Sequence, residues 1–293
     1  MARAQHRGHI CSGESPSARQ LSTQTHPHIV LAPTATKIPD TARGCVLVCG
    51  SHAGAYAGYL AARAEVRAVV LNDAGVGLEQ AGIGALSHCQ DLGIAAAAVA
   101  HTSARIGDAE DMLANGVISH RNAIAAEAGV DPGMRCAEAG ALLSRAPLGR
   151  GESAAYDEAR SVQGLSGHGL RIVCVDSVSL VIADDVGQIV LSGSHGGIVS
   201  GQSNLAIRVA AAAAFYNDAG IGKDQAGVSR LPVLDEQGIA AATVAVASAR
   251  VGDGLSTYES GILSRVNTSA EALGITPGMT AREAVELIVP AGI

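Results

Sequence analysis

The chain has very few aromatic and basic side chains. Its 293 residues include one Phe, five Tyr and no Trp, which leaves little for an aromatic platform that stacks nucleic-acid bases. The net charge is −7, and the only lysines are Lys37 and Lys223. The sequence therefore lacks a broad basic footprint, which argues against DNA, RNA or an anionic membrane surface as a partner.

We also expect no secretory signal peptide and no membrane-spanning segment. No run approaches the roughly 18 apolar residues that a membrane span needs. Residues 1–27 are polar and lack the apolar core of a signal peptide, so we expect a flexible tail and a cytoplasmic protein. A transit peptide is the alternative for this tail, because Arg and Ser outnumber acidic residues there.

Cysteine patterns that bind metals or form redox pairs are absent. The six cysteines form no CxxC pair and no zinc-like cluster with His. We expect free thiols in a reducing compartment, and no motif requires a metal or an organic cofactor. A G-x-G-x-x-G dinucleotide fingerprint after a strand is also lacking. The cysteines are Cys11, Cys45, Cys49, Cys89, Cys136 and Cys174.

The chain does contain a long internal repeat. Residues 72–108 and 217–253 align without a gap and share 21 identical residues over 37 positions. Unrelated segments would agree at about a tenth of positions, so the repeat indicates a tandem duplication. Polar residues that occur in both copies are therefore candidates for a shared site.

Each copy alternates short apolar strands with helices. This rhythm predicts an α/β fold of two three-layer units of Rossmann-like or flavodoxin-like type, each with a mostly parallel sheet. The two units are expected to face each other about a pseudo-twofold axis. The first unit spans residues 28–143 and the second spans residues 170–293. Residues 144–169 are expected to form a linker that includes at most one short helix.

Two expectations concern individual helices of these units. A helix over residues 57–64 predicts a counterpart after Ser203 in the second copy. Ser119 and Asn122 are expected to share one face of a later helix, as are Ser264 and Asn267. The alternative role for these Ser and Asn residues is hydrogen bonding between helices.

The first duplicated motif is Gly-Ser-His-x-Gly, at residues 50–54 and 193–197. It follows an expected strand, and ligands of parallel sheets bind beyond the carboxyl ends of strands. Amides of Gly193, Gly196 and Gly197 would suit a phosphate, a carboxylate or an oxyanion.

The side chains of this motif are candidates for catalysis. We expect His52 and His195 to exchange protons near neutral pH. Ser51 and Ser194 are candidate nucleophiles, but each needs a base from another loop or from the other copy, because adjacent side chains of an extended segment diverge. The alternative is a tight turn in which His caps neighbouring carbonyls.

The second motif is Asn-Asp-Ala-Gly, at Asn72-Asp73 and Asn217-Asp218. Asp73 and Asp218 are expected to orient a His or to bind a ligand hydroxyl. Asn and Asp also commonly cap a helix or bond turn amides, which is the alternative here.

The third motif is Ser-Ala-Arg-x-Gly-Asp, ending at Asp108 and Asp253. Arg105 and Arg250 follow apolar strands, and a guanidinium there can bind a carboxylate or phosphate through two points. Ser248 of the same loop is a further ligand-binding candidate. The alternative is a structural ion pair with Asp108 or Asp253, and the two roles are compatible.

If only one of the two copies carries a functional site, the differences between the copies favour the second copy. Tyr258, whose aligned position in the first copy is not a tyrosine, is a candidate ligand contact. His101 would add to a site that lies between the copies.

These residues predict an enzyme that acts on a small anionic metabolite, with hydrolysis preferred over isomerisation or lyase chemistry. A non-catalytic metabolite-binding or regulatory module is the second hypothesis. A structural protein whose Gly and Ala surfaces pack a homo-oligomer is the third.

Overall fold

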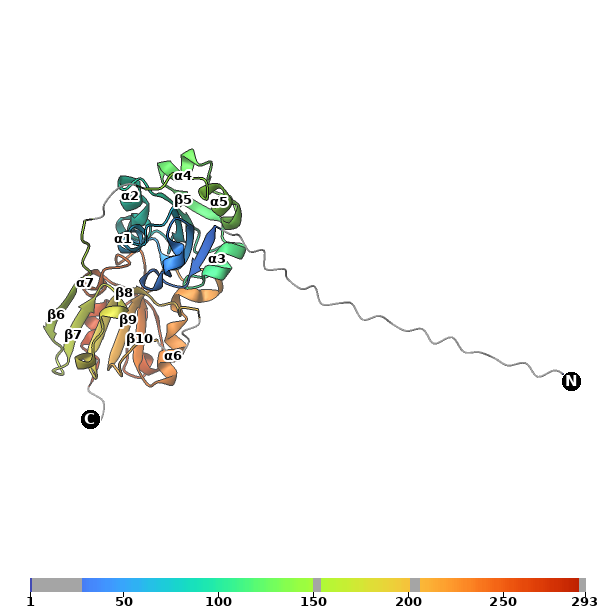
Figure 1. The fold of residues 1–293 in the computed structure, drawn as a ribbon. Coiled ribbons are helices and arrows are strands. Elements are labelled where there is room, and N and C mark those ends of the chain that lie inside the picture. Colours follow the sequence, from blue (N-terminus) through green and yellow to red (C-terminus); the bar gives the residue numbers. More distant parts are fainter. Residues whose placement is uncertain (2–27, 150–153, 201–205, 290–293) are drawn as a thin grey trace.

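The computed structural model describes Met1 and residues 28–149, 154–200 and 206–289. Apart from Met1, the expected flexible tail over residues 1–27 lies outside the described residues. The described elements form two sheets, each with its own helices (Figure 1). We call residues 28–149 the first half and residues 154–289 the second half.

The first sheet has five strands in the order β1-β2-β3-β4-β5. Its first four strands pair in parallel, and β5 is antiparallel to β4. The central strands consist of small and β-branched residues and are almost completely buried, as expected for a sheet covered on both faces. The strands are β1 (Ile29–Ala32), β2 (Val46–His52), β3 (Ala68–Asn72), β4 (Ala95–Val99) and β5 (Ile118–Arg121).

The second sheet has six strands in the order β11-β10-β9-β8-β7-β6. Strands β7 to β10 pair in parallel, and the two edge strands are antiparallel. Both sheets are thus mixed and mostly parallel, which confirms the α/β class. The strands are β6 (Arg160–Leu165), β7 (Arg171–Val175), β8 (Ile189–His195), β9 (Ala213–Asn217), β10 (Ala240–Val244) and β11 (Leu263–Val266).

Helices cover both faces of the first sheet. Side chains from α1 and α2 pack on one face, and side chains from α3, α4 and α5 pack on the other. The α1–α2 contact is close, because a Cβ on Gly58 would lie 3.1 Å from the Cα of Ala85. The helices are α1 (Ala55–Arg63), α2 (Gly84–Asp91), α3 (Ala109–Asn115), α4 (Ala123–Glu127) and α5 (Cys136–Leu143).

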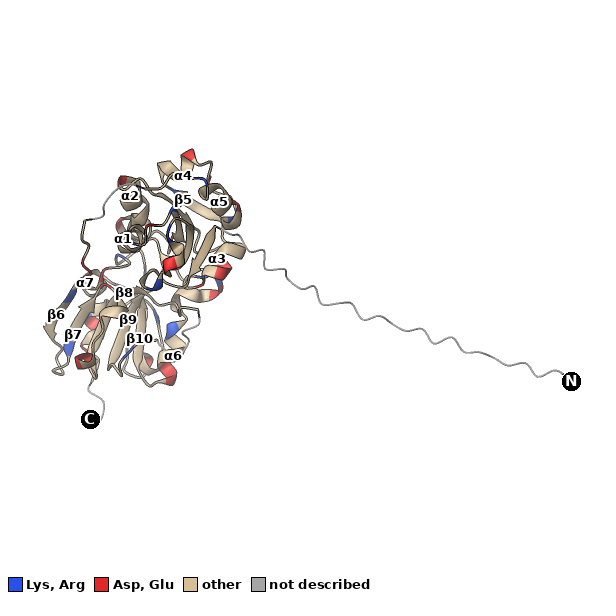
Figure 2. Cartoon of the chain, in the orientation of Figure 1, with Lys and Arg blue, Asp and Glu red and all other residues tan. Residues whose placement is uncertain are grey.

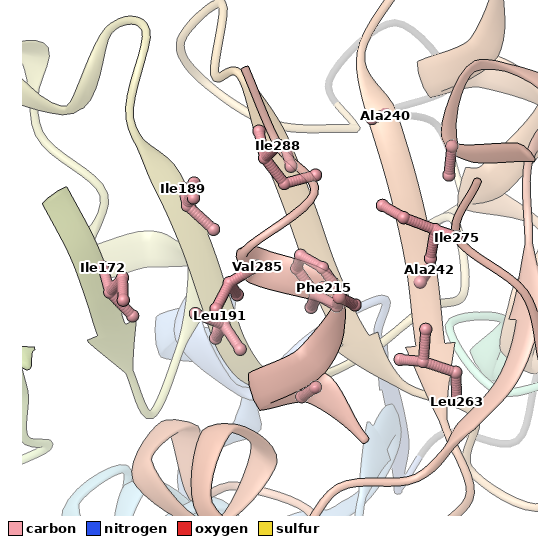
Figure 3. Close-up of a cluster of buried hydrophobic side chains, with 14 of the residues drawn as sticks. Ile172, Ile189, Leu191, Phe215, Ala240, Ala242, Leu263, Ile275, Val285 and Ile288 are labelled. Carbon is pink, nitrogen blue, oxygen red and sulfur yellow. The ribbon is translucent and has the colours of Figure 1, made fainter. Parts of the chain in front are cut away.

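The second sheet is covered differently on its two faces. Residues from α8 and α9 and from the segment just after α9 pack on one face, where Val285 and Ile288 belong to the same buried cluster as Leu191 and Phe215 (Figure 3). On the other face, α6 packs together with residues 206–211. The helices are α6 (Arg230–Glu236), α7 (Gly254–Glu259), α8 (Thr268–Glu271) and α9 (Ala281–Val285).

Short 3-10 helices occupy corresponding loops of the two halves. Two of them follow β1 and two follow β7, while one follows β3 and one follows β9. The 3-10 segments are η1 (Ala35–Lys37), η2 (Asp40–Ala42), η3 (Leu78–Ile83), η4 (Val178–Leu180), η5 (Ala183–Asp185) and η6 (Lys223–Val228).

Three local expectations differ from the structure. Residues 206–212, the described part of the region after Ser203, are not helical. Ser119 lies on β5 and Asn122 caps α4, because an antiparallel edge strand ends there and Asn122 accepts a hydrogen bond from the Ala125 amide. The segment 144–169, expected to be a linker, contains the edge strand β6.

The two halves meet through the loops after β3 and β9. The Leu78 amide donates to the Val246 carbonyl at 2.9 Å, and the Lys223 amide donates to the His101 carbonyl at 2.8 Å. These pairs are reciprocal, since residues 78 and 223 are aligned in the repeat, as are residues 101 and 246. Both loops contain a run of left-handed residues, Ala74–Gly77 and Ala219–Gly222.

Acidic and basic residues are interspersed over both halves (Figure 2). Within the described ranges, no helix has the length and apolar character required to cross a membrane.

Candidate functional site

A cavity of about 170 Å³ lies between the two halves. Equivalent positions of the repeat line it from both sides: His52 with His195, and Ser51 with Ser194. These four residues stand at the carboxyl ends of β2 and β8, where the sequence predicted a site. The two imidazole ring centroids are 6.4 Å apart.

Both histidines make the same hydrogen bond within their own half. Nδ1 of His52 accepts from the Gly54 amide, and Nδ1 of His195 accepts from the Gly197 amide, each at 3.1 Å. A neutral ring that accepts through Nδ1 carries its hydrogen on Nε2. In the described structure neither Nε2 has a protein hydrogen-bond partner, so each ring can donate one hydrogen bond to a ligand.

Burial keeps both rings neutral. It lowers the pKa of His52 to about 4. Burial also holds the pKa of His195 well below its usual range, and the positive charge of Arg230 and the neighbouring His52 add to this. At neutral pH both histidines are therefore hydrogen-bond donors through Nε2 rather than half-protonated acid–base groups.

The two serines are held by the loops beside them. Ser51 Oγ accepts from the Ala35 amide at 2.9 Å, and Ser194 Oγ accepts from the Val178 amide at 3.0 Å. Each hydroxyl keeps its own hydrogen for donation. No carboxylate or imidazole is bonded to either hydroxyl in the described part of the chain, so neither serine has a base that would activate it as a nucleophile.

Arg230 is the most unusual side chain of the cavity wall. It is only 5% exposed, and among the described residues no carboxylate forms an ion pair with it. Its guanidinium donates to the carbonyls of Gly197 and Ala206, and its Cζ lies 5.0 Å from the ring centroid of Tyr216. These contacts satisfy part of the guanidinium, and an anion bound beside it would supply the counter-ion that the described residues do not.

Two exposed cations stand near Arg230 on the same cavity. Lys37 comes from the first half and Arg208 from the second half. Positive groups at the rim of a cavity attract anionic ligands and speed their association.

A second cavity, of about 200 Å³, adjoins the first and shares His52, Tyr56, Glu158 and Asp176 with it. Burial and the nearby Asp176 raise the pKa of Glu158 to about 7, although a hydrogen bond with Tyr56 opposes this change. A carboxyl group that titrates near neutral pH suits general acid–base catalysis.

Asp176 is fixed by backbone amides. Its carboxylate accepts from the Ala159 amide at 2.7 Å and from the Gly254 amide at 3.2 Å. Burial nevertheless raises the pKa of Asp176, and the charge of Asp253 contributes to this rise.

The predicted Asn-Asp residues lie at the junction of the halves and outside both cavities. Asn72 and Asn217 are completely buried and each bridges its own turn to the next loop. Asp73 does orient a histidine, but that histidine is His101, whose Nδ1 lies 2.8 Å from the carboxylate. Asp218 accepts from the amides of Gly220 and Val246.

The predicted arginines are bound by carboxylates. Arg105 pairs with Asp108 of its own loop and with Asp224 of the second half. Arg250 correspondingly pairs with Asp253 and with Glu79 of the first half. The ion-pair alternative is therefore present in the structure.

Some of the predicted ligand-binding residues of the second half line the second cavity, and others do not. Arg250 and Asp253 line it. Ser248 Oγ bonds the Ala245 carbonyl and the Ile262 amide, which fixes the loop before β11. Tyr258 packs on the core of the second sheet, with Arg282 over its ring, and lines neither cavity.

Two of the three predicted glycine amides are already bonded within the protein. The Gly196 amide donates to the Asn217 carbonyl, and the Gly197 amide donates to His195. Gly193 instead allows close packing, because a Cβ there would lie 2.1 Å from the Asp253 nitrogen. These glycines thus position the loop and the imidazole.

Sequence reasoning missed Arg230, Glu158, Asp176 and Tyr56. Arg230 and Asp176 replace Ala85 and Pro33 of the first copy, and the search for shared polar residues passes over such differences. Glu158 lies in the expected linker. Scarcity of aromatic residues is a signal that could have drawn attention to Tyr56.

Metal ligands are not gathered in the described ranges, where no group of three or more His, Cys, Asp or Glu side chains could hold a metal ion. The five described cysteines are free thiols. Comparisons with protein-family models, curated proteins and solved structures found no match to this chain.

Proposed function

We propose that the chain is an enzyme, a hydrolase by preference, that acts on a small anionic metabolite in the two adjoining cavities. Buried Arg230 is the observation that carries this proposal, because a carboxylate or phosphate of the ligand would supply its missing counter-ion. The cavities of about 170 and 200 Å³ are small, which favours a metabolite over a polymer segment.

The surrounding groups support hydrolysis of a carbonyl compound. Ionised Glu158 would take a proton from a water molecule as its oxygen attacks the carbonyl carbon. The Nε2–H groups of His52 and His195 would donate hydrogen bonds to the oxygen on which negative charge develops. Glu158 would then return the proton to the leaving group, so that the enzyme ends the reaction in its starting state.

We also propose that the halves arose by tandem duplication of a Rossmann-like unit and face each other about a pseudo-twofold axis. The reciprocal bonds between Leu78 and Val246, and between Lys223 and His101, support such an axis. The paired positions of the two imidazoles are consistent with it. On this proposal the site lies between the units, so there is one site per chain.

The anion proposal is tested by thermal unfolding in the presence of inorganic phosphate and of butyrate. A bound anion should raise the melting temperature of the wild type, because a ligand that binds only the folded state stabilises it. Arg230→Met should remove this shift, Arg230→Lys should keep part of it, and Arg265→Met, an exposed variant on β11, should leave it unchanged. An equal shift in wild type and Arg230→Met would contradict the proposal.

Turnover separates an enzyme from a binding module. Small amides and esters with a free carboxylate are incubated with the protein and followed by NMR. We expect hydrolysis of at least one, and its loss in Glu158→Gln. Anion binding with no product from any member of the panel would instead support the non-catalytic module.

A further inference from the structure

The second cavity has a different charge from the first. Glu158, Asp176 and Asp253 all line it, and the pKa of Tyr156 on its wall is raised by burial and then by these three carboxylates. Arg250 is the cation of this wall, but Asp253 at 2.8 Å and Glu79 at 3.3 Å already bind it. Neither Glu158 nor Asp176 forms an ion pair with any described residue. The carboxylates at this end of the site therefore outnumber its cation.

Three of the five tyrosines gather at the same place. The Tyr56 ring centroid is 5.6 Å from that of Tyr59 and 5.5 Å from that of Tyr156, and both Tyr56 and Tyr156 line the second cavity. Aromatic faces attract cations. Arg63 shows this attraction at Tyr59, where its Cζ lies 5.8 Å from the ring centroid, although Arg63 lines neither cavity.

The negative end and Arg230 belong to one continuous site. His52, Tyr56, Glu158 and Asp176 line both cavities, and His195 lines the first. His195 is only 7% exposed, and its Nε2 has no protein partner among the described residues, so its N–H is available to a ligand that spans the two ends.

We propose that the ligand is a zwitterion, whose carboxylate binds Arg230 and whose protonated nitrogen binds between Glu158 and Asp176 against the rings of Tyr56 and Tyr156. This inference rests on the proposed function, since it takes Arg230 as the anion-binding residue. It adds the substrate class, which is an amino acid or a short carboxylate that carries a basic nitrogen.

A positively charged nitrogen would also prepare Glu158 for its role as a base. Its charge would offset the repulsion between Glu158 and Asp176 and favour the ionised form of Glu158. The apparent pKa in the enzyme–substrate complex, seen in the pH dependence of kcat, should then lie below that of the free enzyme, seen in kcat/KM.

The test is calorimetric binding of four probes of equal carbon number: butyrate, α-aminobutyrate, γ-aminobutyrate and n-butylamine. At least one of the two amino acids should bind the wild type roughly tenfold or more tightly than butyrate, as charge-assisted hydrogen bonds predict. Glu158→Gln should reduce this advantage to about threefold or less, while butyrate binds no more weakly. Glu271→Gln, an exposed variant on α8, should preserve it.

The outcomes separate this inference from the proposed function. Butyrate binding that depends on Arg230, with no gain from an amino group, would overturn the zwitterion and leave the anion site in place. An amino-group advantage that survives in both Glu158→Gln and Asp176→Asn would also overturn it. Binding of none of the four probes would contradict the zwitterion, whereas phosphate binding by Arg230 would still support the anion site.

Discussion

At the cavities, several aligned positions carry chemically different residues in the two halves. Arg230 occupies the position of Ala85, and Asp176 occupies the position of Pro33. In the first half Ala85 is small enough for α1 to pack closely against it through Gly58. Arg230 is too large for such a contact, and its guanidinium instead bonds the Ala206 carbonyl in a segment that is not helical. This one difference thus accompanies both the non-helical segment 206–212 and the buried charge.

Glu158 should make the stability of the protein depend on pH. An unfolded Glu titrates near 4.3, whereas burial and Asp176 raise its folded pKa to about 7, so the folded state holds the proton more tightly. Stability should therefore fall as pH rises from about 5 to about 8, by on the order of 1 kcal/mol because Glu158 is partly exposed. Urea unfolding at both pH values measures this loss.

The Glu158→Gln variant is the control for this prediction. It cannot ionise, so it should lose less stability than the wild type over the same pH range. Equal losses in the two proteins would show that Glu158 titrates as in the unfolded chain.

Among the elements, the loops after β3 and β9 have the most restricted geometry. Four consecutive residues in each loop adopt left-handed angles, and Gly220 has φ +72°. A Cβ on Gly220 would lie 2.9 Å from the His101 ring and 3.1 Å from the Cα of Gly75. Glycine is therefore required there both for its φ angle and for the close approach of the two halves.

Gly220→Ala should destabilise the protein by roughly 2–3 kcal/mol, because it combines backbone strain with a steric clash. Gly133→Ala is the matched control, since Gly133 also has a positive φ (+92°) but no neighbour within 4 Å of its added Cβ. The control should cost about 1 kcal/mol, from strain alone. Denaturant unfolding compares the two, and equal losses would exclude a contribution from the contact between halves.

Element-level reasoning from the sequence was accurate where hydrophobic patterns were long. The buried parallel strands were predicted, because runs such as Ala95–Val99 have no polar face. Strand β5 was mistaken for part of a helix, since its four residues carry Ser119 and two basic side chains and show no clear period. The edge strand β6 was also missed, because its exposed residues resemble a linker.

At the scale of the whole molecule, the halves are joined by reciprocal contacts of unequal strength. The residues of the backbone bonds and of the glycine contacts are half-buried, whereas the ion pairs of Arg105 with Asp224 and of Arg250 with Glu79 are exposed. Exposed ion pairs contribute little to stability.

The double variant Glu79→Gln, Asp224→Asn should therefore lower the free energy of unfolding by less than about 1 kcal/mol. Asp108→Ala should cost more, about 1–2 kcal/mol, because Asp108 caps α3 through the Asp111 amide and also binds Arg105. Chemical denaturation measures both. A larger loss in the double variant would mean that these ion pairs hold the halves together.

The candidate site could be predicted from the sequence only in part. The sequence repeat identified the strand ends that carry Ser51, His52, Ser194 and His195, and these residues line one cavity. It could not identify Glu158 or Arg230, because each belongs to one half alone. Their importance depends on burial and on missing partners, which are properties of the folded chain.

The first half has Ala85 at the position aligned with Arg230, and this difference makes the cavity chemically asymmetric. A cation lies on one wall, carboxylates lie on another, and two imidazole N–H donors lie between the halves. A ligand with a stereocentre would have to satisfy three chemically different walls at once, and its mirror image would present the same groups in the wrong order. The protein should therefore be enantioselective and bind one enantiomer of α-aminobutyrate more tightly than the other.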